Sequence, residues 1–277
     1  MAGFIQDTTA TKLSPHHYQI TLSDRWEIWG PNGGYLAAIA LRGAGEGFQG
    51  FIPASFYCQY LAVAKFEPVD IFVNVVRDGR SAKSVEVSIS QNDKSILKAL
   101  VWLTLPKQDI EHCFVELPDS WVPLEQSPND HHGWPFKFWD NFEVKALEPK
   151  STPDRKGNGG ICANWFRFLD NNDDNDKSNC LSNPFINAAR SVVLLDTLQW
   201  PATWLAYDEG DLNIVAPSLD LSVQFHHNHS TCPWLFCETR SPHASDGLIS
   251  GCGKVWDQDG RLLASGSSQL LCMPIKR

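Results

Sequence analysis

The sequence has no long apolar run and no surplus of positive charge. None of its apolar stretches approaches the ~20 residues that a membrane-spanning helix needs. The N-terminus, MAGFIQDTTATKL, lacks the basic start and the apolar run of a signal peptide. The formal net charge is −9, whereas nucleic-acid phosphates are bound through an excess of Lys and Arg. We therefore expect a soluble, cytoplasmic protein without a membrane span or a nucleic-acid partner.

Several motifs with well-defined chemistry are also missing. No two of the eight cysteines have C-x-x-C spacing, so we expect buried or free thiols rather than a disulfide framework or a zinc site. No G-x-S-x-G occurs, which argues against the nucleophile elbow of a serine hydrolase. Water is therefore the expected nucleophile of any hydrolytic reaction.

Two polar segments invite a metal interpretation that their residues do not support. His226, His227 and His229 lie in one short turn, where three imidazoles rarely converge on one ion. Asp170–Asn179 is acidic, but Asn175 and Leu181 stand where a calcium loop needs Gly and Glu. We interpret this segment as a solvated loop and expect no metal and no cofactor.

What the sequence does contain is a repeat. Its 277 residues are enough for two domains of ~100–150 residues. Apolar runs and hairpin turns indicate antiparallel strands between residues 55 and 105, and the stretch 217–274 repeats this design about 165 residues later. Gln59 and Gln224 occupy similar places, as do Pro68 and Pro233. The offset predicts a duplicated domain.

Each half is predicted to carry one helix ahead of its strands. Tyr35–Ala44 consists of good helix formers, and Asn183 with Pro184 predicts the start of a helix that runs to about Gln199. One helix followed by an antiparallel meander, twice, is an α+β arrangement in which the two sheets join edge to edge. We expect an N-terminal unit over residues 1–106, a connection crossing the surface over 107–159, and a C-terminal unit over 160–277.

Three segments carry a resemblance to a known family. They are Gly30–Arg42 (GPNGGYLAAIALR), Val75–Gln91 (VVRDGRSAKSVEVSISQ) and Pro217–Pro274. Together with the two helices, they span most of the chain outside the connection, and their order and duplication are more specific than any one of them. The sequence resembles the double-hotdog acyl-CoA thioesterase family, which includes bacterial acyl-CoA thioesterase II. The resemblance implies a double hotdog fold and hydrolysis of an acyl-CoA or other acyl-thioester, and it leaves open whether the chain forms a homo-oligomer.

The resemblance also implies a site at the seam between the halves, where a carboxylate, a hydroxyl and an amide position a water. Carried over to this chain, the carboxylate is Asp196, and the hydroxyl is Ser218, where the bacterial enzyme has threonine. An ungapped alignment puts Ser268 in the place of the amide, with Gln269 one residue later. Gln269 can face the water only if a bulge, for example at Gly266, restores its direction, because a one-residue slip turns a side chain to the other face of a sheet.

The residues themselves allow both functional and structural interpretations. On a helix, Asp196 shares an apolar stripe with Val192, Val193 and Trp200, which would desolvate it and suit it to general-base catalysis; a rotated helix would instead turn it to solvent. Ser218 begins the polar face of its strand and could simply bond to the backbone.

Two further groups are candidates for substrate binding. Amides at Asn32-Gly33-Gly34 could stabilise a developing oxyanion at a helix start, although glycines there could equally serve a tight turn with positive φ. Arg77 and Arg80 could bind CoA phosphates, although surface turns often carry such charges for solubility.

Two other functions remain open. A hotdog hydratase or dehydratase would use an Asp/His pair, for which Asp220 and His226 are candidates on one face of a regular strand. A non-catalytic acyl-binding module would explain Ser268 in the place of the amide.

Overall fold

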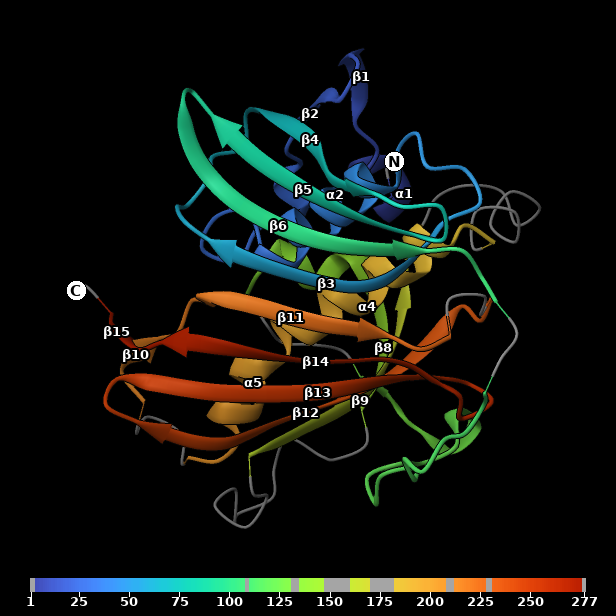
Figure 1. Ribbon diagram of the computed structural model, residues 1–277. Helices are drawn as coiled ribbons and strands as arrows, with labels where there is room; N and C mark the ends of the chain where they lie inside the picture. Colours follow the sequence, from blue (N-terminus) through green and yellow to red (C-terminus); the bar gives the residue numbers. More distant parts are fainter. Residues whose placement is uncertain are drawn as a thin grey trace.

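The computed structural model describes residues 3–107, 110–130, 135–146, 160–169, 182–207, 212–227 and 231–275. Its strands form one antiparallel sheet of 13 strands in the order β1-β2-β4-β5-β6-β3-β11-β14-β13-β12-β9-β8-β7, beside a two-stranded sheet of β10 and β15. The large sheet curls around two central helices, as Figure 1 shows. The α+β class and the single continuous sheet predicted from the repeat are confirmed.

The first half consists of short N-terminal elements, one long helix and four long strands. These elements are α1 (Phe4–Asp7), β1 (Thr11–Ser14), β2 (His17–Thr21), the 3-10 helix η1 (Asp24–Trp26), α2 (Gly33–Gly45), β3 (Ile52–Tyr60), β4 (Pro68–Asp78), β5 (Ala82–Gln91) and β6 (Lys94–Thr104).

The second half begins with short elements and continues with a helix and its own meander. These elements are η2 (Leu124–Gln126), β7 (Asn129–Asp130), η3 (Lys137–Asn141), β8 (Phe142–Ala146), β9 (Ile161–Phe168), α4 (Pro184–Thr197), α5 (Gln199–Trp204), β10 (Ile214–Val215), β11 (Asp220–Phe225), β12 (Trp234–Ser245), β13 (Leu248–Asp257), β14 (Leu262–Leu271) and β15 (Met273–Pro274).

The two halves repeat one topology. In the first half the strands run β2-β4-β5-β6-β3 across the sheet, and in the second half β9-β12-β13-β14-β11. The first strand of the large sheet after each long helix, β3 or β11, therefore lies at the centre. These two strands pair antiparallel, from Ser55 opposite Gln224 to Gln59 opposite Asp220, and so join the halves into one sheet.

The long helices of the two halves pack against each other on one side of the sheet (Figure 1). Their contact is close because a side chain at Gly34 would lie 2.9 Å from the Cα and carbonyl oxygen of Val193. Ala37, Ala38 and Val192 are completely buried around this contact. The start of α2 and the end of α4 consequently meet at the seam between the halves.

Part of the predicted connection is built into the second half. Strand β8 pairs along β9, and β7 pairs with β8, which extends the sheet at its far edge. Phe138, Trp139 and Phe142 from this segment are buried in the main core. The description of residues 107–159 as a surface crossing is therefore wrong for residues 129–130 and 137–146. Periodicity could not reveal these strands because they are two and five residues long.

The described residues also bear on two composition-based predictions. All seven cysteines in the described part of the chain are free thiols. Among the described helices, none is both long enough and apolar enough to cross a membrane.

Candidate active site

Helix α4 presents Asp196 at the seam between the halves. Asn183 caps the helix by accepting a hydrogen bond from the backbone N–H of Phe185 at 2.9 Å, and Pro184 takes the first helical position, where no N–H is needed. Asp196 lies in the last turn and is only 6% exposed. The prediction that it shares the buried face of the helix is confirmed, and the solvent-facing alternative is wrong.

Burial controls the acidity of Asp196. Removal from water raises its pKa from 3.8 to about 6, while Tyr60, Ser218 and the backbone N–H of Gly34 favour the charged form and act in the opposite direction. A carboxylate with a pKa near neutrality can take a proton from a reacting water at physiological pH, as a general base must.

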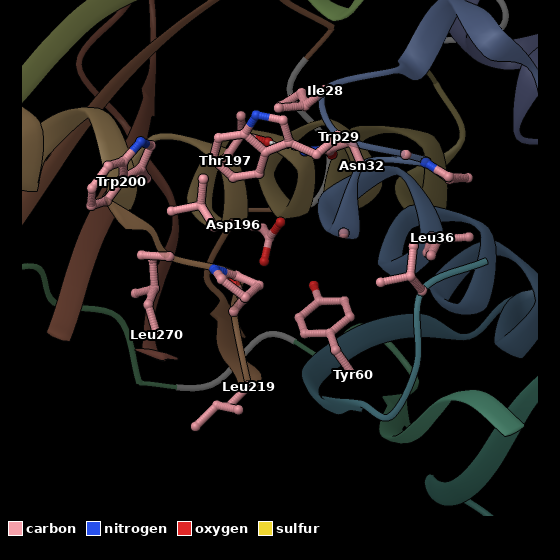
Figure 2. Close-up of a pocket in the computed structure, with 18 of the residues that line it drawn as sticks. Ile28, Trp29, Asn32, Leu36, Tyr60, Asp196, Thr197, Trp200, Leu219 and Leu270 are labelled. Atoms are coloured by element: carbon pink, nitrogen blue, oxygen red, sulfur yellow. Dashed lines mark hydrogen bonds between the residues drawn. The ribbon is translucent and has the colours of Figure 1, made fainter. Parts of the chain in front are cut away.

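Two titratable groups of β3 lie near the carboxylate. Burial, and secondarily the charge of Asp196, raises the pKa of Tyr60, while burial with a smaller contribution from Asp196 raises the pKa of Cys58. Both groups are therefore neutral where Asp196 titrates. The Tyr60 hydroxyl points toward Asp196 in Figure 2, but neither this hydroxyl nor Asp196 Oδ1 has a hydrogen-bond partner of good geometry among the described residues. Tyr60 could not be predicted from the sequence, because only the pairing of β3 with β11 brings it to α4.

The two glycines at the start of α2 allow the helix end to approach the carboxylate. A Cβ at Gly33 would lie 2.9 Å from Asp196 Oδ2, and one at Gly34 would collide with Val193. Neither glycine is among the described residues with positive φ, so the tight-turn explanation for them is wrong. Close approach is the physical reason for the pair.

Asn32 locks the two helix ends together. Its side-chain oxygen accepts from the backbone N–H of Tyr35 at 2.9 Å, which caps α2, and its amide nitrogen donates to Thr197 Oγ1 at 3.2 Å. The side-chain amide is thus occupied by structural hydrogen bonds. Asn32 lines the cavity described next, yet its main contribution is to hold the start of α2 against the end of α4.

A cavity of about 470 Å³ opens beside Asp196. Residues of both halves form its wall, and Asp196 is the one carboxylate among them, as Figure 2 illustrates. The wall is otherwise mainly apolar or aromatic, and it includes Trp29, Leu36, Leu61, Val63, Phe136, Trp139, Trp200, Ala216, Leu219, Leu270 and Met273. The arrangement suits an apolar group whose reactive end lies at the carboxylate.

Ser218 also lines this cavity, because the chain bulges where β11 begins. Ser218 pairs with Leu270 and Ser222 pairs with Ser267, so residues 219–221 face only residues 268 and 269 on β14. One extra residue on the β11 side reverses the alternation. Ser218 is thereby turned to the buried side, although a regular strand would place it on the polar face.

The bulge predicted at Gly266 is wrong. β14 pairs with β13 in unbroken register from Leu271 to Ala264, and the irregularity of this pair lies beyond, between Val255 and Trp256. Ser268 is accordingly buried, whereas Gln269 points to the other face, where its side-chain oxygen accepts from Ser250 Oγ at 3.4 Å. The structure does not bring the Gln269 amide to the cavity.

The arginines predicted to bind phosphates lie at the other end of the sheet. Arg77 and Arg80 belong to the β4–β5 hairpin, near the start of β3, while the cavity lies at Tyr60, where β3 ends. Nine residues of strand separate the ends by roughly 25–30 Å. Both arginines are exposed, and the Arg77 guanidinium lies 5.8 Å from the Trp102 ring centroid. Neither lines the cavity.

The residues suggested for a hydratase do not form a pair. Asp220 and His226 are six residues apart on β11 and just beyond it, or about 20 Å along a strand. Asp220 Oδ1 accepts from the backbone N–H of Gln269 at 3.0 Å, and the His226 ring contacts Ser265 Oγ at 3.0 Å. Neither residue lines the cavity that holds Asp196.

Of the segments considered for metal binding, only His226 and His227 lie within the described residues. Asp170–Asn179 and His229 lie outside the described residues, and the His227 ring contacts the Leu262 carbonyl oxygen at 2.9 Å. The described residues contain one cluster of potential ligands, Cys232, Asp257 and Asp259. In it, Asp257 Oδ1 accepts from two backbone N–H groups of its own turn.

A buried carboxylate, a helix start and an apolar cavity at the seam of a duplicated sheet agree with the family comparison. The family model described as the acyl-CoA thioesterase N-terminal domain matches residues 22–104, and that of the C-terminal domain matches residues 118–273. The chain belongs to the acyl-CoA thioesterase family. It is thus a thioesterase, a hydrolase of thioesters. The C-terminal match begins inside the predicted connection, in agreement with the strands found there. No curated protein matches the chain.

Solved structures agree on the fold. The tesB protein of Mycobacterium avium subs paratuberculosis is 19% identical with a TM-score of 0.77, and the alignment covers 98% of each chain. Acyl-CoA thioesterase II TesB2 of Mycobacterium marinum is 18% identical with a TM-score of 0.78, again over 98% of each chain. A hot dog fold protein of Alicyclobacillus acidocaldarius is 18% identical with a TM-score of 0.75, over 99% of this chain and 98% of the other. At these identities the likeness establishes the double hotdog fold.

Proposed function

We propose that this thioesterase hydrolyses acyl-CoA by a water that Asp196 activates at the seam between the two halves. The observation that carries the proposal is a buried carboxylate with a pKa raised to about 6, at the one place where both halves line an apolar cavity. Ser218 lines the same cavity beside the carboxylate and orients the water. Gln269, which faces away, has no part in this mechanism.

The reaction needs no group beyond these residues and water. Asp196 takes a proton from the water as its oxygen attacks the thioester carbonyl carbon, and the carbonyl oxygen becomes an oxyanion. The backbone N–H of Gly33, which lines the cavity at the start of α2, stabilises that charge, while the N–H of Gly34 interacts with Asp196. When the C–S bond breaks, the sulfur leaves as a thiolate that acquires the proton, and the products are a carboxylic acid and a thiol.

The cavity wall indicates how the substrate lies. The acyl group occupies the apolar cavity, with its carbonyl carbon near Asp196 and Ser218. The CoA portion of the bound substrate extends out of the cavity past Trp29 and Val63, which are exposed at its mouth. Arg77 and Arg80 are too far away to contact it.

Release of free thiol from acyl-CoA tests the proposal directly. Wild-type protein should hydrolyse acyl-CoA, with kcat/KM falling as the pH drops through about 6, because protonated Asp196 cannot act as a base. Asp196→Asn should lower the rate about 10²–10⁴-fold, the usual effect of removing a general base. Asp220→Asn is the matched control outside the cavity and should retain most of the rate. An Asp196→Asn variant as active as wild type would refute the assignment, and no thiol release by the wild type would favour a non-catalytic acyl-binding module.

A further inference from the structure

Among the described residues, three buried oxygens around the end of α4 have no hydrogen-bond partner of good geometry, in addition to the Tyr60 hydroxyl that points toward Asp196. They are Asp196 Oδ1, Gln199 Oε1 and Ser268 Oγ, and each is inaccessible to solvent. Gln199 as a residue is completely buried, and Asp196 and Ser268 are each 6% exposed. Buried polar atoms are normally paired, so three unpaired ones in a small region need an explanation.

Gln199 is fixed by its surroundings. Its amide nitrogen donates to the backbone oxygen of Leu195 at 2.9 Å, which leaves the amide oxygen facing the sheet. A Cβ at Gly251 would lie only 1.9 Å from that oxygen, so the Gln199 side chain occupies the space that any other residue at position 251 would need. No role for Gln199 could be predicted from the sequence, because Gly251 is distant along the chain and only folding brings the two residues together.

The sheet places Ser268 and the residues next to Asp196 and Gln199 on neighbouring strands. The strand order is β11-β14-β13, with Gly251 of β13 directly opposite Ser268 of β14. Ser218, which acts on Asp196, pairs with Leu270, two residues along β14 on the same face as Ser268. The carboxylate therefore stands at one side of β14, the Gln199 amide lies over the other side, and Ser268 lies between them. Asp196 in the last turn of α4 and Gln199 at the start of α5 are three residues apart, with Leu198 between the two helices.

The hydrogen-bonding capacity of the three atoms matches a single water. Asp196 Oδ1 and Gln199 Oε1 can only accept, while the Ser268 hydroxyl can donate. One water can donate to both acceptors and accept from the hydroxyl, and buried waters typically make about three such bonds. Neither Gln199 nor Ser268 lines the cavity, so this water lies behind the carboxylate and is distinct from the attacking water.

We propose that Gln199 and Ser268 are positioning residues for Asp196, acting through one buried water that donates to Asp196 Oδ1 and Gln199 Oε1 and accepts from the Ser268 hydroxyl. The water holds Oδ1 on the sheet side, so that Oδ2 stays beside Gly33 at the start of α2. This inference rests on the proposed function of Asp196 as the base. The orientation of the carboxylate then depends on a side chain from α5.

The proposal predicts how the acidity of Asp196 responds to substitution. A hydrogen bond donated to the carboxylate favours its charged form, so losing the water raises the pKa of Asp196, by about half to one pH unit for one bond. The titratable groups of β3 that face Asp196 are Tyr60 and Cys58, and Cys58 also senses Asp220. Gly33 and Gly34 of α2, Gly251 of β13 and Ser268 of β14 have no ionisable side chain.

The decisive experiment measures this titration in Gln199→Met, which keeps the side-chain length but removes the amide. Carboxyl ¹³C NMR of aspartate-labelled protein, with the Asp196 signal assigned by Asp196→Asn, should show the midpoint of Asp196 shifted upward by about half to one pH unit. For acyl-CoA hydrolysis, kcat should fall about 2- to 10-fold with KM nearly unchanged, and the loss should be larger at pH 6 than at pH 8. Gln224→Met, on the exposed face of β11, is the control and should leave both the midpoint and the rate unchanged.

Two further variants keep the test decisive if Gln199→Met does not fold. Ser268→Ala removes only the hydroxyl, and Gly251→Ala displaces Gln199 without altering it, so both should shift the Asp196 midpoint in the same direction. Adding Ser268→Ala to Gln199→Met should cause little further change, because both act through one water. A midpoint unchanged in all folded variants, even with a lower melting temperature, would overturn the proposal. Because NMR detects Asp196 without turnover, a shifted midpoint in a protein that hydrolyses no thioester would refute the proposed function alone.

Discussion

At the scale of single residues, Asp196 shows how burial sets the acidity of the proposed base. The side chain is buried where the start of α2 meets the end of α4 and is 6% exposed, so its charged form is disfavoured. The nearby Tyr60 and Ser218 side chains and the Gly34 N–H offset only part of the lost hydration. The same desolvation that destabilises the carboxylate brings its pKa to the range in which a general base is effective.

The cost of burying Asp196 predicts an unusual effect of pH on stability. Its pKa is about 6 in the folded protein against 3.8 as the ordinary value, so between these pH values the folded state binds more protons than the unfolded state. The contribution of Asp196 to the free energy of unfolding should therefore decrease as the pH rises from about 4 to 6. Above pH 6 this contribution should stay constant. At about 1.4 kcal/mol per pKa unit, the loss is roughly 3 kcal/mol.

Asp196→Asn should remove this dependence. We expect the variant to melt at a higher temperature than wild type at pH 8, where the carboxylate is charged, and at a similar temperature at pH 4, where it is neutral. Thermal unfolding followed by circular dichroism at the two pH values measures this difference. A variant less stable than wild type at pH 8 would contradict the assigned direction of the pKa shift.

At the scale of elements, the site depends on where a helix start meets a helix end and on one irregular strand. The start of α2 approaches α4 because Gly33 and Gly34 have no side chains, and Asn32 connects the two ends through Thr197. The bulge before β11 then turns Ser218 toward the same point.

Asn32→Ala should separate a stabilising role from a functional one. Losing the cap of α2 should cost about 0.5–2 kcal/mol of stability, and losing the link to Thr197 should also lower kcat, because the helix start moves relative to Asp196. Asn183→Ala is a matched control, since Asn183 caps α4 in the same way at its other end. We expect both variants to lose similar stability in denaturant unfolding, while only Asn32→Ala loses activity. Equal activity of the two variants would show that Asn32 acts as a cap alone.

At the scale of the whole molecule, neither half contains the site. Tyr60 and the start of α2 come from the first half, and Asp196, Ser218 and Gln199 come from the second. The halves are joined through hydrogen bonds between β3 and β11. Separation would expose the edges of both strands together with the apolar faces of α2 and α4, a combination that promotes aggregation.

Expression of the halves as separate chains tests this dependence. Residues 1–106 and 107–277 should each be aggregated or inactive alone, and co-expression should restore a soluble complex with thiol-releasing activity. Size-exclusion chromatography and the thiol assay measure the two properties. A soluble second half with the rate of the full chain would place the site entirely within that half.

Local and repeated patterns explain how much of this could be predicted from the sequence. Alternation of polar and apolar residues, the offset of about 165 residues and the Asn183-Pro184 start determine the meanders, the duplication and α4. Helical periodicity places Asp196 beside Val192 and Val193 but allows a rotated helix as well, and the family resemblance was needed to single it out. The short strands β7 and β8 have too few residues to show an alternation of polar and apolar side chains. The predicted connection therefore included residues that belong to the sheet.

What only the tertiary structure decided is the register of paired strands and the contacts that follow from it. Alternation placed Ser218 on the polar face of a regular strand, and a bulge at Gly266 was needed to turn Gln269 inward. In the structure the extra residue lies at the start of β11 instead and turns Ser218 inward. The regular pairing of β14 with β13 leaves Ser268 inward and Gln269 outward. A bulge is set by the pairing of strands distant in the chain, which local sequence does not encode. The contact of Gln199 with Gly251 joins a helix and a strand about fifty residues apart, and it arises only when the sheet has closed around the helix.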